Sequence, residues 1–375
     1  MERCLNCMEI YDEQYDICPY CGFKKNTPPD IKYHLYPGTV IANRYIIGTV
    51  IGHGGFGVTY VAWDTQLSIK TAVKEFYPAG LVSRSAETTD LINMSAESDQ
   101  EYKAGIDRFL EEAKTIAQFN KEKDIVHVYD YLRENNTAYI VMEYIEGKTL
   151  ESSLKSYPDE RMPVEQAVDI VKKIARALKT IHANGTIHRD LSPGNIVLCN
   201  DGSVKILDFG AARLFTAEKS QNLSVILKPG YAPPEQYGGR TTQDERTDLY
   251  ALGAVLYRMV VGEMPPEALE RSKEQDMTRP GVLREDLPIW VDRIIMKAMA
   301  LNQDDRFHNA SEFEEALNKG VQFILQEKST SEREESATNI IMVVVWIILM
   351  CGVLYGVYWY THLTIKPEWL LQLGG

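Results

Sequence analysis

The hydrophobic positions between residues 44 and 142 follow two periods. Short runs rich in β-branched and aromatic residues at 45–51, 58–63 and 71–74 predict β-strands, as does the apolar run 138–147. From Ile106 to Ala117 the apolar residues recur three and four positions apart, which predicts an amphipathic helix. This part of the chain is therefore expected to be β-rich, with one helix inserted.

Longer periodic segments follow. Apolar side chains recur at helical spacing over 164–181, with Pro163 at the start and Gly185 just past the end. These are the residue types that helix termini prefer. A second apolar helix is expected to begin at Asp248 and to end near Gly262. The pattern predicts a helical region after residue 143.

One segment near the end of the chain carries no charge. Residues 340–360 are apolar, with Tyr358, Trp359 and Tyr360 clustered at one end. At about 1.5 Å per residue, such a helix spans the roughly 30 Å hydrocarbon core of a bilayer. Aromatic residues gather at membrane interfaces. A transmembrane helix is expected; a buried core helix is the alternative.

Composition limits the partners. The chain has 375 residues, 45% of them hydrophobic, which is enough for two or three domains. Its net charge is −13, from 40 Lys and Arg against 53 Asp and Glu. General nucleic-acid binding depends on neutralising phosphates and is therefore not expected.

Four of the six cysteines lie in the first 21 residues. Cys4-x2-Cys7 and Cys18-x2-Cys21 are each able to present two thiolates to one tetrahedral metal. Four soft ligands with no open position suit a structural Zn²⁺. The spacing is similar to that of a small zinc ribbon, and a redox pair or free thiols are the alternative.

The role of this module is open, because zinc ribbons bind nucleic acid, bind proteins or cap a domain. Lys24 and Lys25 are its one run of positive charge. Protein contact or regulation is therefore favoured over nucleic-acid binding.

Chemistry-bearing residues gather between His188 and Gly210. Asp190, Asn195 and Asp208 offer hard oxygen ligands of the kind Mg²⁺ prefers when it is shared with phosphates. A carboxylate can also orient a hydroxyl and accept its proton. Two apolar runs flank the turn residues 200–203, which predicts a hairpin with Asn195 and Asp208 at one end.

A glycine-rich loop occupies residues 52–57, with the sequence Gly-His-Gly-Gly-Phe-Gly. Glycines let backbone N–H groups approach a nucleotide without a Cβ in the way. A dinucleotide-binding loop would open a helix. Here the residues from Val58 to Trp63 form a strand-like run, so a loop between two strands is predicted.

These motifs, in this order, resemble those of bacterial eukaryotic-like (Hanks-type) serine/threonine protein kinases. The loop at His188 resembles the catalytic loop, and Asp208-Phe209-Gly210 resembles the metal-binding triplet. The fold that the resemblance implies is α+β and two-lobed, with a small β-rich N-lobe at 44–142 and a helical C-lobe at 143–320. The catalytic loop lacks the Ala-Ala-Arg of tyrosine kinases, which favours Ser and Thr hydroxyls of proteins as acceptors.

The resemblance implies roles for individual residues. Lys74 would hold the ATP phosphates, with Glu112 as its partner; Glu112 lies on the flank of the apolar face of its helix. Asp190 would orient and deprotonate the acceptor hydroxyl, and Asn195 and Asp208 would hold Mg²⁺. The other expected ATP contacts are Ile51, Gly52, Gly54, Gly55, Phe56, Gly57, Val58, Ala72, Met142, Glu143 and Ile145.

Two positions depart from the kinase pattern. Many serine/threonine kinases have Lys two residues after the catalytic Asp, where this chain has Ser192. Three residues before Tyr231, where a Thr is usual, this chain has Lys228. A serine cannot stabilise transition-state charge, and we hypothesise that Lys228 supplies it. A pseudokinase scaffold, which binds nucleotide or partners without phosphoryl transfer, is the rival function.

The segment after Asp208 resembles a kinase activation segment that ends at Glu235, and Arg306 resembles the arginine that pairs with that glutamate. Thr216, Ser220 and Ser224 are candidate phosphorylation sites.

The expected organisation combines these parts. It comprises a zinc ribbon at 1–25, a linker at 26–43, the kinase domain at 44–320, a juxtamembrane linker at 321–339, the transmembrane helix at 340–360 and a short extracytoplasmic tail at 361–375. The polar stretch 80–105 is expected to be a mobile insertion. Because ATP and reduced thiols are cytosolic, the kinase domain should lie in the cytoplasm, anchored to the cell membrane. Two questions stay open: whether the zinc ribbon binds nucleic acid, and whether the chain forms a homodimer.

Overall fold

The computed structural model describes most of the chain. The residues described are 1–85, 88–94, 99–209, 227–238, 242–271, 277–320, 349–350 and 352–360. Two compact units are formed, Met1–Leu317 and Asn318–Gly375.

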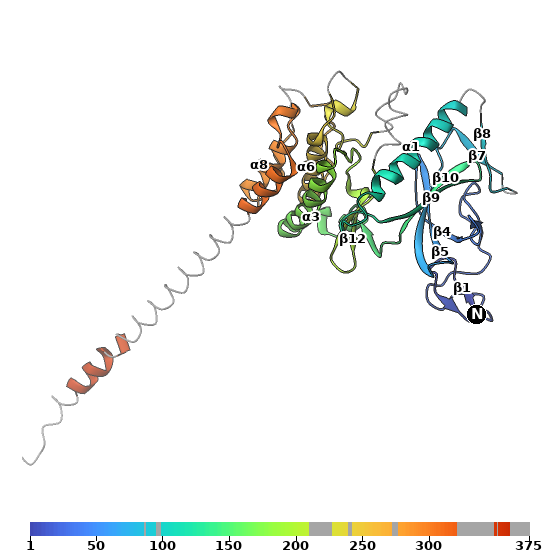
Figure 1. The fold of residues 1–375 in the computed structure, drawn as a ribbon. Coiled ribbons are helices and arrows are strands. Elements are labelled where there is room, and N and C mark those ends of the chain that lie inside the picture. Colours follow the sequence, from blue (N-terminus) through green and yellow to red (C-terminus); the bar gives the residue numbers. More distant parts are fainter. Residues whose placement is uncertain are drawn as a thin grey trace, which may run out of the picture. The chain divides into compact units, whose positions relative to one another are not determined.

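Strands dominate the first part of the larger unit (Figure 1). They are β1 (Glu2–Arg3), β2 (Ile10–Tyr11), β3 (Val40–Ile41), β4 (Tyr45–Gly54), β5 (Gly57–Asp64), β6 (Ile69–Phe76), β7 (Val82–Arg84), β8 (Leu91–Asn93), β9 (Val128–Glu134), β10 (Thr137–Glu143), β11 (Gly147–Thr149), β12 (Ile196–Cys199) and β13 (Val204–Ile206).

Helices dominate the second part. The α-helices are α1 (Asp99–Ala117), α2 (Leu150–Leu154), α3 (Val164–Ala183), α6 (Glu245–Val261), α7 (Pro280–Leu283) and α8 (Ile289–Ala298). The 3-10 helices are η2 (Pro158–Glu160), η3 (Pro193–Asn195), η4 (Pro234–Gln236) and η5 (Gln303–Asp305), and residues 310–320 are also helical.

The β-rich part is built on a six-stranded antiparallel sheet in the order β3-β4-β5-β6-β10-β9. Helix α1 packs against β9 and β10 (Figure 1). The strands predicted at 45–51, 58–63 and 71–74 are confirmed as β4, β5 and β6. The run predicted at 138–147 is divided, because β10 ends at Glu143 and β11 begins at Gly147.

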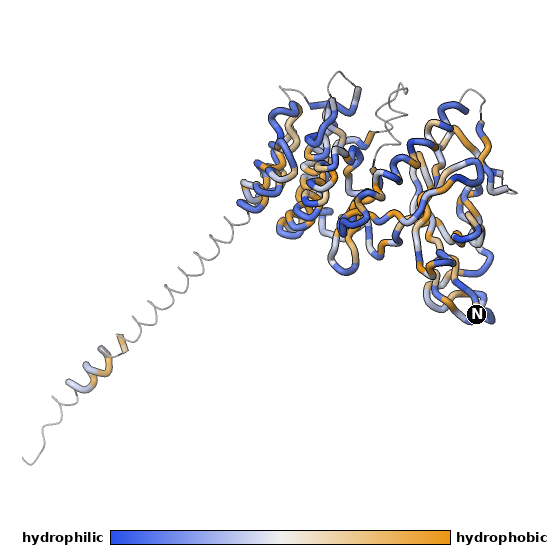
Figure 2. Tube along the Cα trace, viewed as in Figure 1, coloured by the Kyte–Doolittle hydropathy of each residue, from blue (hydrophilic) through white to orange (hydrophobic). Residues whose placement is uncertain are grey.

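The helical part is organised around α6, which packs against α3 and α8. Every residue of α6 from Thr247 to Val261 is buried, which suits a helix that is apolar on most sides (Figure 2). The helix ends at Gly262, whose φ of +86° is left-handed. A Cβ there would lie 2.2 Å from the carbonyl oxygen of Asp159, so only glycine fits.

The segment predicted as a linker, 26–43, is part of the folded unit. Tyr33 stacks on Tyr77 with ring centroids 4.7 Å apart, and Leu35 is buried. The Leu35 N–H donates to the Tyr60 hydroxyl at 3.1 Å, and β3 pairs with β4. The packing of this segment depends on partners that are distant along the chain, which its composition does not show.

The polar stretch 80–105 also differs from expectation in its described part. Its strands β7 and β8 pair with each other, and Arg84 is buried between the stretch and the main sheet. The Arg84 guanidinium forms an ion pair with buried Glu75 and donates to the Tyr33 carbonyl at 2.8 Å. Hydroxyls of Tyr60 and Tyr139 also donate to Glu75, so the carboxylate is well compensated.

The predicted transmembrane segment lies partly outside the described residues. Within the parts of the chain that the structure describes, no helix is long and apolar enough to cross a bilayer. Of the segment 340–360, residues 349–350 and 352–360 are described; they are helical and exposed. The segments 321–339 and 361–375 lie outside the described residues.

A buried ion pair joins two distant segments of the helical part. Arg306, 1% exposed, donates from Nη1 and Nη2 to the two carboxylate oxygens of Glu235, at 2.7 and 3.0 Å. It also donates to the carbonyls of Ala300 and Leu301, and Thr247 donates to Glu235 at 2.9 Å. Burial opposes ionisation of Glu235, but the bonds and the positive charge of Arg306 together with the bond from Thr247 outweigh it, and the pKa of Glu235 is lowered. The predicted pairing of Arg306 with Glu235 is confirmed.

Replacing Arg306 with Ala should lower the free energy of unfolding by about 3–5 kcal/mol, because it leaves a buried carboxylate without its cation. Since folding lowers the pKa of Glu235, the stability from the pair exists above the ordinary carboxyl pKa and is lost as the pH falls through the lowered value. The loss caused by R306A should therefore shrink on acidification. Denaturant unfolding of the parent and the variant at two pH values measures this.

A matched control is Arg133→Ala, which removes an exposed arginine that pairs with exposed Asp107. Equal effects of the two substitutions would contradict the importance of the buried pair.

Candidate active site

A cavity of about 510 Å³ lies between the glycine-rich loop and the catalytic loop. Its size falls in the usual range for small-molecule sites. The lining residues that were predicted from the sequence are Ile51, Gly52, Gly54, Gly55, Phe56, Gly57, Lys74, Glu112, Ile145, Asp190, Asn195 and Asp208. The structure therefore brings together residues that are separated by more than 150 positions in the chain.

The catalytic loop is held by a buried carboxylate from α6. Asp248, 0% exposed, accepts the backbone N–H groups of His188 and Arg189, both at 2.8 Å. Arg189 has a φ of +68°, a conformation that is strained for a residue with a Cβ. The two bonds compensate for that strain, and the bend directs Asp190 into the cavity.

Asp190 and Asn195 are fixed to each other. The Nδ2 of Asn195 donates to Asp190 Oδ2 at 2.6 Å and to the Asp190 carbonyl at 2.8 Å. The Leu207 N–H donates to the Asn195 carbonyl at 2.8 Å, which ties this residue to the end of β13. With its Nδ2 used in this way, Asn195 presents Oδ1 as the amide atom that can bind a metal.

Lys74, on β6, forms an ion pair with Asp208 at 2.8 Å. Glu112 is 3% exposed on α1 and lines the same cavity. Its neighbour Glu111 is exposed and pairs with Lys114, which supports the choice of Glu112 as the site carboxylate. The pairing of Glu112 with Lys74 stays a prediction.

Four other predicted contacts lie close by but outside the lining. Val58 and Ala72 are buried on β5 and β6, and Met142 on β10 pairs in register with Ala72. The Glu143 N–H donates to the His127 carbonyl at 2.9 Å, and Lys205 binds its side chain at 2.6 Å. The backbone carbonyl is therefore the group of Glu143 that is expected to contact a nucleotide.

Several lining residues were not singled out from the sequence: Thr59, Tyr144, Gly147, Thr149, Gly194, Val197 and Leu207. Two of them carried a usable signal. Val197 stands two positions after Asn195, and Leu207 stands just before Asp208. In a hairpin whose end carries the ligands, the adjoining apolar residues are expected to form the floor of the site.

His188 has a structural role. Its Nε2 lies 2.8 Å from the Leu207 carbonyl, and its Nδ1 accepts the Asp190 N–H at 3.3 Å. Burial lowers the pKa of His188, and the accepting Nδ1 fits a ring that carries its proton on Nε2. Phe209 packs on this ring and on Phe119, at centroid distances of 4.9 and 5.9 Å.

The charge around the cavity has a chemical consequence. Glu112, Asp190 and Asp208 bring three carboxylates to its walls, with Lys74 among them. A triphosphate beside these carboxylates would be repelled unless cations screened the contact. The donor set of Asn195 and Asp208, an amide and a carboxylate oxygen, fits Mg²⁺ that is shared with phosphates.

The two residues that depart from the kinase pattern lie in contact. Lys228 Nζ donates to Ser192 Oγ at 2.5 Å and lies 3.4 Å from Asp190 Oδ2. Ser192 is 2% exposed. The hypothesis that an ammonium reaches this position is therefore consistent with the geometry. Candidate phosphorylation sites Thr216, Ser220 and Ser224 lie outside the described residues.

The four N-terminal cysteines lie together in one cluster. Their sulfur atoms all lie within 4.8 Å of one another, with Cys4 and Cys21 3.5 Å apart and Cys7 and Cys18 3.8 Å apart. A tetrahedral zinc with bonds of about 2.3 Å would have sulfur–sulfur edges of about 3.8 Å. The residues therefore fit such an ion.

The two cysteine turns repeat one geometry. The Met8 N–H donates to the Cys4 carbonyl at 3.0 Å, and the Gly22 N–H donates to the Cys18 carbonyl at 2.9 Å. Both donors have a left-handed φ, +67° for Met8 and +75° for Gly22. This repeated turn directs the sulfur atoms of each pair to the same point.

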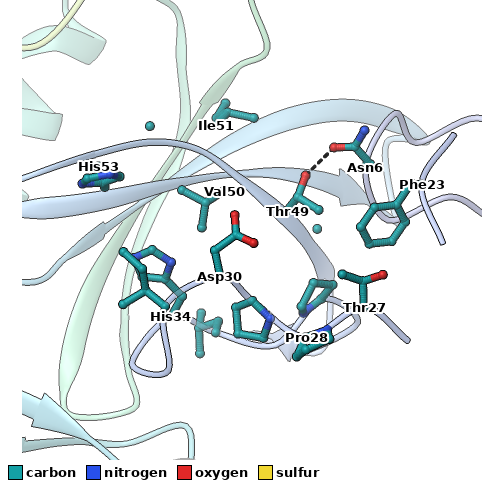
Figure 3. A pocket seen from close by; sticks show the side chains of 16 residues that line it. Asn6, Phe23, Thr27, Pro28, Asp30, His34, Thr49, Val50, Ile51 and His53 are labelled. Atoms are coloured by element: carbon teal, nitrogen blue, oxygen red, sulfur yellow. Dashed lines mark hydrogen bonds between the residues drawn. The ribbon is translucent and has the colours of Figure 1, made fainter. Parts of the chain in front are cut away.

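The cysteine module packs against β4. The Thr49 N–H donates to the Leu5 carbonyl at 2.8 Å, and the Thr49 hydroxyl donates to Asn6 at 2.6 Å (Figure 3). A Cβ on Gly48 would lie 2.2 Å from the Leu5 carbonyl oxygen, so glycine is required for this close approach. The Arg3 guanidinium lies 3.3 Å from the Trp63 ring centroid.

A second cavity, of about 580 Å³, lies between this module, the 27–37 segment and β4 (Figure 3). Its walls include His34, His53 and Asp30 but no lysine or arginine. It therefore lacks the cations that a phosphate site needs.

Comparison with known proteins places these features in a family. The protein kinase domain family matches residues 45–333. A probable serine/threonine-protein kinase of Clostridium acetobutylicum is 33% identical over 75% of this chain and 40% of its own length. The serine/threonine-protein kinase PknB of Mycobacterium leprae is 32% identical over 72% of this chain and 42% of its own. The chain thus spans about two-fifths of these relatives.

Among solved structures, PpkA-294 in its apo form is 33% identical, with a TM-score of 0.70, over 76% of this chain and 99% of that one. The two-lobed arrangement, with its β-rich N-lobe, is the protein kinase fold. This chain belongs to the protein kinase domain family.

Proposed function

We propose that the protein transfers the γ-phosphoryl group of ATP to Ser and Thr hydroxyls of proteins, itself included. The observation that carries this proposal is the convergence of Lys74, Asp190, Asn195 and Asp208 on one cavity under a glycine-rich loop. The names of the clostridial and mycobacterial relatives support serine and threonine as acceptors.

The residues divide the work. Backbone N–H groups of the glycine-rich loop cover the phosphates, and Lys74 binds them. Asn195 and Asp208 hold Mg²⁺, which neutralises charge on the phosphates when bound. Asp190, fixed by Asn195, orients the acceptor hydroxyl and receives its proton at Oδ1 or Oδ2.

The rival, a pseudokinase scaffold, is not favoured by any observation. Its one support was Ser192, and Lys228 places an ammonium beside that residue.

Asp190→Asn should reduce phosphoryl transfer by about 10²- to 10⁴-fold, because an amide cannot accept the hydroxyl proton. Labelling from γ-³²P-ATP with Mg²⁺, on the chain itself and on a generic protein acceptor, measures the rate. The matched control is Asp201→Asn, in the exposed turn of the same hairpin, which should leave the rate unchanged. A parent protein that binds nucleotide but transfers no label would support the scaffold instead.

We further propose that Cys4, Cys7, Cys18 and Cys21 hold one structural Zn²⁺. The sulfur–sulfur separations support this, and so does the repeated turn at both pairs. A role in protein contact or regulation fits better than nucleic-acid binding, because Arg3 lies on Trp63 and Lys25 pairs with Glu2.

Elemental analysis of the purified chain should find one zinc per molecule. Cys7→Ser should lose the metal and lower the melting temperature, since so small a module has little core of its own. Cys199→Ser, in β12, is the control and should keep the zinc. A metal-free parent whose mass shows two disulfides would establish the redox alternative.

We also propose that residues 340–360 anchor the protein in the cell membrane with the kinase domain in the cytoplasm. The sequence of this segment supports the proposal, since it has no charged residue. The described residues of the segment also expose large apolar side chains, among them Leu354, Val357 and Trp359.

The full chain should float with liposomes and stay bound in high salt, because apolar insertion is not screened by ions. A chain that ends at residue 339 should remain in the soluble fraction, since residues 1–317 form a compact unit. Flotation of the shortened chain, or release of the full chain by salt, would contradict insertion.

A further inference from the structure

Ser192 and Lys228 together show an exchange of side-chain chemistry between two positions of the kinase pattern. In the kinase pattern, the position of Ser192 carries a lysine and the position of Lys228 carries a threonine. This chain has the hydroxyl where the ammonium is expected and the ammonium where the hydroxyl is expected. The two groups nevertheless meet, with Lys228 Nζ 2.5 Å from Ser192 Oγ.

After the exchange, the site still has one ammonium and one hydroxyl from these two positions. The Lys228 ammonium lies 3.4 Å from Asp190 Oδ2 and donates to the Ser192 hydroxyl, so the same Nζ joins the carboxylate and the hydroxyl. Because Asp190 faces the acceptor hydroxyl, a cation at this distance from its carboxylate lies near the point where phosphoryl transfer takes place.

The backbone around Lys228 is built to keep it there. The Lys228 carbonyl accepts N–H groups from Tyr231 and Ala232, both at 3.2 Å. Gly230 has a φ of +78°, and a Cβ on it would lie 2.4 Å from the Pro265 carbonyl oxygen. This tight turn fixes the direction from which Lys228 enters the site.

Ser192, which accepts the hydrogen bond from Lys228, is also held in place. Ser192 is 2% exposed and precedes η3, and its carbonyl accepts the Asn195 N–H at 2.9 Å. Asn195 in turn donates to Asp190. Lys228, Ser192, Asn195 and Asp190 thus form one connected set of polar groups.

We propose that Lys228 is a catalytic residue that performs the task of the missing catalytic-loop lysine from the opposite side of the site. The proposal rests on the proposed kinase activity. In the transfer step, the acceptor oxygen forms a bond to the γ-phosphorus while the bond from that phosphorus to the β–γ bridging oxygen breaks. The acceptor proton goes to Asp190, and the electron pair leaves with ADP.

Lys228 stays protonated throughout this step. Its ammonium contacts the transferring phosphoryl oxygens and the acceptor oxygen, where negative charge is shared as the bond forms and breaks. Ser192 is a positioning residue, because it touches Lys228 and holds the ammonium in place.

A purely structural role for Lys228, as an ion-pair partner that orders the segment after residue 227, is the competing account. It predicts that loss of Lys228 lowers stability, or weakens nucleotide and substrate binding, without a selective effect on kcat.

The test is a reciprocal exchange in the full chain, with steady-state kinetics, ATP binding and melting temperature measured for each form. Lys228→Thr should lower kcat by about 10²- to 10³-fold, as for loss of one transition-state donor, with KM for ATP changed little. Ser192→Lys alone crowds two ammonium groups and should also be slow. The double variant Ser192→Lys, Lys228→Thr restores the usual arrangement and should recover most of the parental kcat.

Lys228→Gln, which keeps the length of the side chain but removes its charge, covers the case in which the threonine variant unfolds. A folded K228Q or K228T that retains parental kcat overturns the proposal. So does a double variant no faster than the slower single variant while remaining folded and able to bind ATP.

These outcomes are distinct from failure of the kinase activity. If the parent protein binds ATP but transfers nothing, the proposed function is contradicted and the role of Lys228 falls with it. If the parent is active and the K228 variants are equally active, only the role of Lys228 is contradicted.

Discussion

The active site depends on one buried carboxylate. Asp248 has no exposed surface and accepts the backbone N–H groups of His188 and Arg189. Without these bonds the left-handed φ of Arg189 would cost on the order of 1–3 kcal/mol with nothing to offset it. Because the bend at Arg189 directs Asp190, the position of the proposed base is set by a residue that never reaches the cavity. Asp248 lies within the stretch of α6, from Thr247 to Val261, in which every residue is buried.

Charge distribution is the second constraint. Three carboxylates line the cavity with one lysine, so phosphate binding requires added cations and exact placement of the ammonium groups that are present. Lys74 is already engaged with Asp208. An ammonium beside Asp190 therefore makes a large difference to the local potential, and this is where Lys228 lies. Phosphoryl transfer at such a site requires an ammonium group close to Asp190, whichever position in the chain supplies it.

Much of the fold and of the site could be predicted from the sequence, because the relevant signals are local. The glycine-rich loop is recognisable from its own residues and from the strands on either side. Asn195 and Asp208 are brought together by a hairpin whose turn residues are also local. Glu112 could be separated from Glu111 by the direction each faces on one helix.

The packing of two segments could not be predicted, because it depends on residues far away in the chain. The segment 26–43 contains Pro28, Pro29, Pro37 and Gly38 and resembles a linker in composition. In the structure Tyr33 of this segment stacks on Tyr77, which directly follows β6. In the same way, Arg84 in the polar stretch 80–105 is buried in an ion pair with Glu75 of β6. Neither pairing is visible in the composition of the segment itself, so long-range partners decided both outcomes.

The packing of the cysteine module on the rest of the chain also depends on long-range contacts. It was predicted as a separate unit, yet Leu5 and Asn6 bond Thr49, and Gly48 has no side chain where the module approaches. The same strand, β4, continues through Gly52 and Gly54, which line the active-site cavity. Between these two places the pairing of β4 with β5 shifts register twice, at Ile47–Val50 and at Val50–Gly52, and such irregularities bend a strand. A single element thus carries both the surface on which the cysteine module packs and the glycine-rich loop of the cavity.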